Sequence, residues 1–198
     1  MKLSSSYYTN PSAEFLAKDL LGKILCTRTD DGITSGIIVE TEAYFGTLDK
    51  ASHAYGNRRT PRTETMYIEG GVAYVYLCYG IHFLLNVVTS VKDDPQCVLI
   101  RSIEPLEGLE IMEMRRKMPA DQKAISSGPG SVTKALGIDS SFNKDILTGD
   151  RIWIEDRAIS FHTSQVSTVP RIGIAYAQEH ASLPLRFFVK DSKFVKVK

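Results

Sequence analysis

A run without formal charge, from Val72 to Val88, constrains the fold of this chain more than any other segment. Apolar and polar residues alternate along it as they do in strands, and Tyr79-Gly80 at its centre is a typical tight-turn pair. A membrane-spanning helix needs about 20 mostly apolar residues, more than this run supplies. The run therefore predicts a β-hairpin whose tip carries Tyr79 and Ile81.

Strand-like alternation recurs along the rest of the chain. The other predicted strands cover residues 23–28, 36–44, 97–103, 151–155, 171–175 and 185–189. Helix patterns begin after an N-cap at Asn10, at Pro105 and near Ser131. Strands with helices at their periphery, and no composition break that marks a linker, predict one α+β domain over residues 1–198.

Charge and cysteine content narrow the function classes only slightly. The 198 residues carry 24 basic and 23 acidic side chains, so a polyanionic partner would have to be recognised by local clusters. Cys26, Cys78 and Cys97 are scattered and form no metal-binding spacing, which predicts free thiols in a reducing, cytoplasmic compartment. The first residues lack the apolar core of a signal peptide.

Two carboxylates, Glu40 and Glu42, fall on the same face of the predicted strand 36–44. Their Cα atoms would lie about 7 Å apart, and paired carboxylates near that distance can cleave glycosidic bonds. The alternative is that both face solvent from a half-exposed strand. Arg101 interrupts an apolar strand, so it must be paired or face a wet cavity, and an acid such as Glu42 is the expected partner.

Three local features could serve a polyanionic partner. Residues 57–62 carry three arginines and no acid, although a solvated loop would explain them equally. Ser-Gly-Pro-Gly at 127–130 precedes a predicted helix and could offer N–H groups to a phosphate, or it could be a simple helix entry. Tyr79 at a hairpin tip is difficult to bury, so its ring could stack on a base or wedge between bases.

In this order, the motifs resemble the alkyladenine (3-methyladenine) DNA glycosylases of base-excision repair, in their bacterial form. The resemblance covers nearly the whole chain, and its most specific segments are VETEAY at 39–44 and YVYLCYG at 74–80. The other matching segments are LAKDLLG at 16–22, TPR at 60–62, LIRSIEPLEG at 99–108, SGP at 127–129 and PLRF at 184–187. The resemblance implies a single mixed domain with a curved antiparallel sheet, peripheral helices and a protruding β-hairpin.

The resemblance also implies a role for individual positions. Glu42 would be the general base that activates a water for attack on C1′ of a flipped nucleotide. Arg101 and the main-chain carbonyl of Ile172 would hold that water. The walls and edges of the base pocket would be formed by Tyr44, His53, Tyr76 and Asn86, the last of which crowds an exocyclic amino group on guanine. The residues that contact DNA would be Tyr79 as the wedge, Ile81 beside it, Arg58 and Thr60.

The implied function is excision of damaged purines of the 3-methyladenine, 7-methylguanine, hypoxanthine and ethenoadenine class from double-stranded DNA. Electron-rich pocket walls would favour a cationic alkylated purine by cation–π attraction, worth roughly 0.5–2 kcal/mol. No cofactor and no metal is implied, and no lysine matches a Schiff-base role, so we expect hydrolysis that leaves an abasic site. Family members often carry a lysine at the position of Ser131, which predicts weaker phosphate anchoring here unless Lys134 compensates.

The protein is expected to act as a monomer, with no membrane partner. Two other functions are alternatives. One is a catalytically silent module that binds lesions on the same scaffold. The other is a carbohydrate hydrolase that uses Glu40 and Glu42, which would leave the arginine-rich loop and Tyr79 unexplained.

Overall fold

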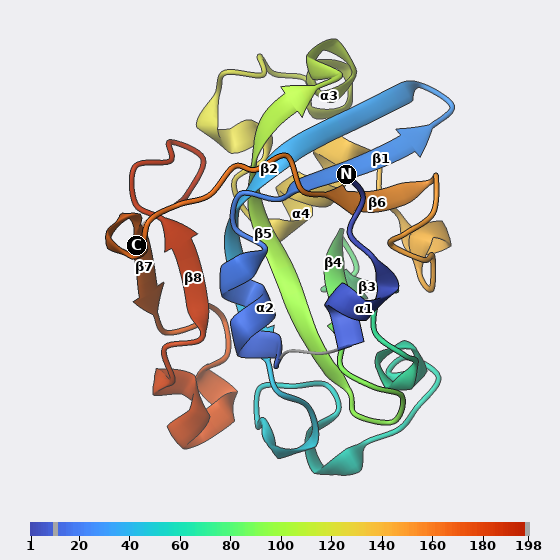
Figure 1. Ribbon diagram of the computed structural model, residues 1–198, viewed down its shortest axis with the longest axis vertical. Helices are drawn as coiled ribbons and strands as arrows, with labels where there is room; N and C mark the ends of the chain where they lie inside the picture. Colours follow the sequence, from blue (N-terminus) through green and yellow to red (C-terminus); the bar gives the residue numbers. More distant parts are fainter. Residues whose placement is uncertain (10–11, 197–198) are drawn as a thin grey trace.

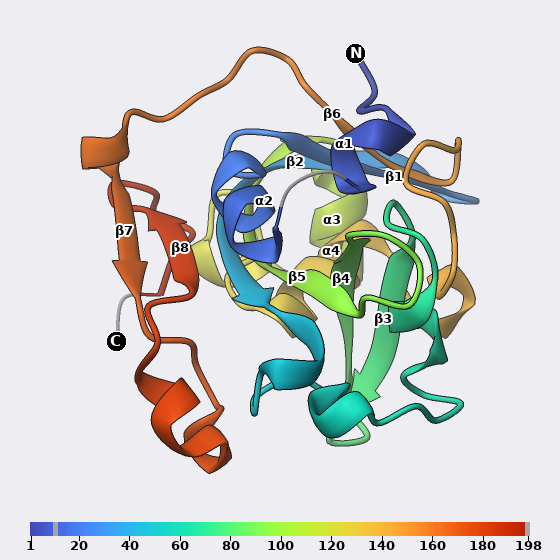
Figure 2. The same cartoon turned by 60° about the horizontal axis from the view of Figure 1, so that its bottom comes forward.

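Eight strands form one antiparallel sheet in the computed structural model, which describes residues 1–9 and 12–196 (Figure 1). The sheet is strongly curved (Figure 2). The order along it is β3 (Ala73–Cys78), β4 (His82–Thr89), β5 (Gln96–Glu107), β2 (Gly32–Tyr44), β1 (Ile24–Thr29) and β6 (Ile152–Glu155). β1 pairs with the first part of β2, residues 32–37, and β8 (Arg186–Val189) pairs with residues 40–42 on the same side. β8 in turn pairs with β7 (Val166–Val169). The predicted mixed α+β fold with a curved antiparallel sheet is confirmed.

Four short α-helices lie around this sheet (Figure 1): α1 (Ser5–Thr9), α2 (Ala13–Asp19), α3 (Leu109–Arg116) and α4 (Pro129–Leu136). The side chain of Ser12 accepts a hydrogen bond from the N–H of Phe15 and so caps α2. The predicted cap, Asn10, lies outside the described residues. Helix α2 packs on β2 and β5, and α4 packs on β4, β5 and α3.

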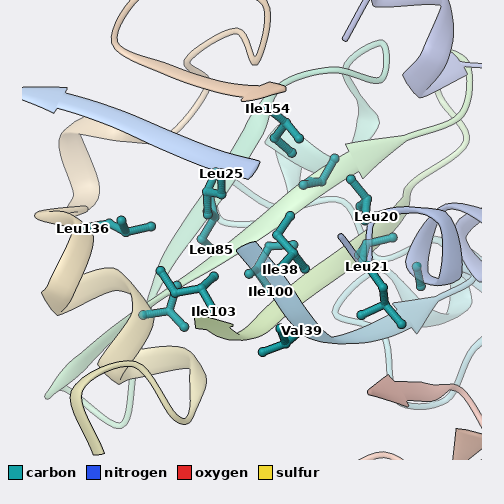
Figure 3. Packing of buried hydrophobic residues seen from close by; sticks show 14 of the residues in the cluster. Leu20, Leu21, Leu25, Ile38, Val39, Leu85, Ile100, Ile103, Leu136 and Ile154 are labelled. Carbon is teal, nitrogen blue, oxygen red and sulfur yellow. The ribbon is translucent and has the colours of Figure 1, made fainter. Parts of the chain in front are cut away.

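The core forms where α2 and α4 meet the sheet. One buried cluster contains Leu20 and Leu21 after α2, Leu136 at the end of α4, and Leu25, Ile38 and Ile100 on the central strands (Figure 3). These side chains are almost completely buried. Burial of this kind stabilises by about 25 cal/mol per Å² of apolar surface, and it holds the central strands of the sheet in place.

The hairpin of β3 and β4 matches its prediction closely. Tyr79, Gly80 and Ile81 connect the paired residues Cys78 and His82, and the φ angles of Tyr79 and Gly80, +50° and +73°, are of the left-handed kind common in tight hairpin turns. Tyr79 is 91% exposed, and Ile81 is also exposed. Tyr79 is therefore a surface residue, as its place at the hairpin tip predicts.

Three sequence predictions fail for local reasons. Pro105 does not open a helix: β5 continues to Glu107, with Pro105 opposite Gly36, and α3 begins only after Gly108. Residues 171–175 form a bend and the start of a 3₁₀ helix (Ala175–Ser182) rather than a strand. Strict alternation in β2 is broken because Val39 is an extra residue in the pairing with β5, so that Ile38 and Val39 both enter the core.

The loops that follow β2 and precede β3 gather at one end of the molecule with the hairpin and with the segment before β8 (Figure 2). The loop between β2 and β3 contains three short 3₁₀ helices, Gly46–Leu48, Tyr55–Asn57 and Glu64–Tyr67. Across residues 1–9 and 12–196, no helix has the length and apolar character to span a membrane.

Candidate active site

A cavity of about 650 Å³ opens at this end of the molecule. Four segments surround it: the loop after β2, the hairpin, the start of α4 and residues 172–176. Among its lining residues are seven of the eleven positions predicted for the site: Tyr44, His53, Tyr76, Tyr79, Asn86, Arg101 and Ile172. The fold thus gathers residues that lie far apart in the sequence around one cavity.

Glu42 lies directly behind this cavity wall and is 0% exposed. Its Oε1 accepts a hydrogen bond from the N–H of Ile172 at 2.8 Å and forms an ion pair with Arg101, 3.1 Å from Nη1. Its Oε2 accepts from the hydroxyl of Tyr44 at 2.8 Å. A buried carboxylate is costly unless it is hydrogen-bonded and paired, and here it has two hydrogen bonds and one ion pair. The alternative that Glu42 is a solvent-facing acid is therefore wrong.

Arg101 joins this carboxylate to the second one. Its Nε donates to Glu40 Oε1 at 3.0 Å, and Arg186 Nε donates to the same oxygen at 2.6 Å. Ser102 Oγ donates to Glu40 Oε2 at 2.8 Å. Burial would lower the pKa of Arg101, but Glu42 and Glu40 more than offset it, so the guanidinium stays charged. Glu40 is also buried, which contradicts the idea that it faces solvent.

A pair of bulges brings Arg101 to this position. Val39 is unmatched on β2, and one residue later in the pairing Arg101 is unmatched on β5. Bulges next to active sites often redirect a side chain, and here a charged residue in an apolar strand turns toward two carboxylates. The predicted pairing of Arg101 with Glu42 is confirmed.

Ile172 contacts the carboxylate through its main-chain N–H, whereas the sequence analysis assigned its carbonyl to a water. The residue before it, Arg171, is buried and paired with buried Asp49, with 2.9 Å between Nη2 and Oδ1. Arg171 also donates to the carbonyl of Ala43. This ion pair fixes the segment at Ile172 against the end of β2.

Aromatic side chains form the wall on the hairpin side. His53 Nδ1 lies 2.9 Å from the hydroxyl of Tyr74, and the His53 ring meets Tyr76 edge-on at 4.7 Å between centroids. Burial, helped by the charges of Arg62 and Arg58, lowers the pKa of His53 to about 4. His53 is therefore neutral at pH 7. Burial also raises the pKa of Tyr74 to about 12, so that this phenol stays protonated.

Asn86 lies on β4, opposite Tyr74 of β3, and is buried. Its Nδ2 donates to the carbonyl of Tyr74 at 3.3 Å, and its Oδ1 lies 3.8 Å from the Cys97 sulfur, which donates weakly. Its amide is thus held in one orientation beside the cavity.

The four predicted positions that do not line the cavity differ among themselves. Glu42 lies behind the wall, while Ile81 is exposed at the hairpin tip. Arg58 is exposed in the loop after β2, and the N–H of Thr60 donates to Thr63 Oγ1 within that loop. Nothing in these contacts assigns Arg58 or Thr60 to a nucleic acid.

Sequence reasoning did not assign Arg62 and Tyr176 a site role, although both line the cavity. Arg62 was visible only as one of three arginines in a basic loop. Tyr176 donates to the carbonyl of Ala51 at 3.1 Å, and no signal in the sequence pointed to it. Within the described ranges, no three His, Cys, Asp or Glu side chains cluster in a way that could hold a metal ion.

Comparisons with known proteins identify the family. The family model for methylpurine-DNA glycosylase matches residues 6–193. A relative from Chlamydia abortus is 46% identical over 94% of this chain and 97% of its own length, and one from Clostridium perfringens strain 13 is 43% identical over 100% of both. Both carry the name "Putative 3-methyladenine DNA glycosylase".

The fold and the comparisons define a DNA repair enzyme, a hydrolase that acts on N-glycosyl bonds. The chain belongs to the methylpurine-DNA glycosylase family. The resemblance drawn from its sequence motifs is confirmed.

Proposed function

We propose that this protein flips a damaged purine nucleotide out of double-stranded DNA and hydrolyses its N-glycosidic bond with a water activated by Glu42. One observation carries the proposal: a buried carboxylate, held by two hydrogen bonds and an ion pair, lies directly behind the wall of an aromatic cavity. A base inside a duplex hides its glycosidic bond, so it must leave the stack at a cost of a few kcal/mol.

The chemistry assigned to Glu42 follows from its free lone pairs. An ionised carboxylate has about four acceptor sites; Ile172 and Arg101 cover Oε1, and Tyr44 takes one site on Oε2 and leaves the other open. A water bound there would transfer a proton to Glu42 as its oxygen forms a bond to C1′. The C1′–N9 bond breaks, its electron pair leaves with the purine, and an abasic site remains. Tyr44 must shift slightly to admit the water, because Glu42 is closed off from the empty cavity.

The remaining predicted roles are part of this proposal. Tyr44, His53 and Tyr76 would surround the flipped base, and Asn86 would crowd the exocyclic amino group of guanine. Tyr79 would fill the gap in the duplex with Ile81 beside it, and Arg58 and Thr60 would contact the backbone. The substrates would be methylated, ethenylated and deaminated purines, and the protein would act as a monomer.

The sugar-hydrolase reading loses its second carboxylate. Glu40 is 2% exposed, and Arg101, Arg186 and Ser102 hold it, so it cannot reach a leaving-group oxygen in the cavity. Glu40 instead neutralises the two arginines and orients Arg101.

The first prediction tests the carboxylate. Wild-type protein is incubated with duplex DNA that contains one hypoxanthine or one methylated purine, and abasic sites are then cleaved with alkali. We expect strand scission at the lesion, lost by at least about 100-fold in Glu42→Gln because general-base catalysis contributes that much. Binding of lesion DNA should be retained. Glu110→Gln, on α3, is the matched control and should leave excision unchanged.

Two results would contradict the proposal. Lesion binding without excision by the wild type would favour the silent module. Full activity of Glu42→Gln would remove the general base from the mechanism.

A further inference from the structure

We propose that Arg62 is a specificity-determining residue that favours excision of electrically neutral damaged purines over cationic ones. This inference rests on the proposed function and concerns the same cavity. It starts from a charge on the cavity wall that the mechanism does not use.

Arg62 stands out among the cations of the cavity. Its guanidinium lies over the ring of Tyr76, 5.0 Å from the centroid, and its side chain lines the cavity. Along residues 1–9 and 12–196 no carboxylate pairs with it. Arg101 and Arg171, in contrast, are each paired with buried acids. Arg62 therefore contributes a positive charge to the wall that no acid of the described chain neutralises.

Both candidate stacking rings already face a cation. Arg171 lies over the ring of Tyr44 at 4.7 Å, as Arg62 does over Tyr76. A cation on one face of a ring draws on the same electron density that a cationic base would use. A cationic purine placed beside Arg62 would also be repelled by it. These contacts weaken the expectation that the pocket selects cationic purines by cation–π attraction.

Arg62 also supplies what the departure of a neutral purine requires. When the C1′–N9 bond of a hypoxanthine nucleotide breaks, the electron pair stays on N9, and the base becomes negative until a solvent proton reaches it. A fixed cation beside the base stabilises that charge. His53 cannot do so, because it is neutral at pH 7. A 7-methylguanine nucleotide is already cationic and leaves as a neutral base, so it gains nothing from Arg62 in departure.

The test compares two lesions at one position of the same duplex, hypoxanthine and 7-methylguanine. Single-turnover excision rates are measured with enzyme in excess for wild type, Arg62→Gln and Arg62→Lys. We expect Arg62→Gln to shift the ratio of the two rates toward 7-methylguanine by about tenfold, a change of about 1.4 kcal/mol in relative barrier height. Arg62→Lys keeps the charge and should keep most of the wild-type ratio.

Arg59→Gln is the matched control for loss of a positive charge from the same loop. Arg59 is paired with Glu64 and Asp93 and does not line the cavity, so its loss should leave the ratio unchanged. Thermal unfolding of each variant checks that it is folded. We expect wild-type stability, because the side chain of Arg62 is exposed.

The outcomes separate the inference from the function on which it rests. Equal loss of both rates in Arg62→Gln, as a plain phosphate contact would give, overturns the role in specificity and leaves the proposed function intact. An unchanged ratio does the same. A wild-type protein that releases neither base overturns both.

Discussion

His53 illustrates how one residue couples the site to the stability of the fold. Its pKa lies near 4 in the folded protein and near 6.5 in an unfolded chain, mainly because the ring is buried and secondarily because Arg62 and Arg58 repel a proton. Between these two values the unfolded chain binds a proton that the folded protein does not. The free energy of unfolding therefore falls as pH falls through this window, and above pH 6.5 the effect is absent.

We predict that the wild type loses more stability between pH 7 and pH 5 than His53→Asn does. The difference should be about 1–2 kcal/mol, after allowance for the partial exposure of the ring. Urea unfolding of both proteins at the two pH values measures it, and any constant effect of the lost contact with Tyr74 cancels. Equal losses would show that His53 is protonated freely in the folded state.

At the scale of elements, the hairpin of β3 and β4 combines an exposed aromatic ring with an unfavourable backbone. Tyr79 has a φ of +50°, a conformation that costs a residue with a side chain about 1–2 kcal/mol. Asparagine adopts this conformation far more readily. The tyrosine is thus kept at a position where local backbone preference disfavours it.

Tyr79→Asn should therefore separate stability from function. We expect the free energy of unfolding to stay the same or rise by about 0.5–1 kcal/mol, because the turn is relieved. Excision of hypoxanthine from a duplex should fall at least tenfold if Tyr79 is the wedge that we propose. Chemical denaturation and single-turnover rates report the two effects. A fall in both would show that Tyr79 supports the fold, and no fall in excision would remove its role as a wedge.

The sequence predicted strands and contacts well where the prediction depends on residues close together in the chain. The hairpin followed from alternation around Tyr79-Gly80, and the pairing of Arg101 followed from the cost of an unpaired charge in an apolar strand. The bulges at Val39 and Arg101 were not predictable. An extra residue moves every later side chain to the opposite face of the sheet, and no particular residue type marks where this happens.

The misplaced ends of elements have a similar cause. The sequence predicts a helix start at Pro105, yet Pro105 continues β5 beyond the stretch that β4 covers, where the strand has an open side and a missing N–H does little harm. Most roles in the site came from the family resemblance rather than from pattern. The contributions of Arg62, Arg171 and Tyr176 depend on long-range packing that no local rule reports.

At the scale of the whole molecule, one buried ion pair joins distant parts of the chain. Asp49, in the loop after β2, pairs with Arg171, which precedes β8. Asp49 also accepts from the main-chain N–H groups of Phe45 and Ala51, so it organises its own loop as well. The pair holds two walls of the cavity together and positions the N–H of Ile172 at Glu42.

We predict that Asp49→Asn destabilises the protein by about 3–5 kcal/mol, because it leaves a buried guanidinium without its counter-charge. The shift of Ile172 should also lower the excision rate measured at a temperature where the variant is folded. Glu107→Gln, which breaks an exposed pair with Arg157, should leave both almost unchanged. A stable Asp49→Asn protein with normal rates would show that the cavity walls are held by other contacts.

The pairing of β8 with β2 carries a consequence for shortened forms of the protein. β8 covers residues 40–42 of β2, supplies Phe187 to the core and provides Arg186 to Glu40. Without β8, residues 40–42 of β2 would keep β5 on one side and have an open edge on the other. That open edge could pair with a strand from another copy. A variant that stops before residue 184 should therefore accumulate as insoluble aggregates instead of a soluble but inactive enzyme, and Glu42 would lie where those copies join.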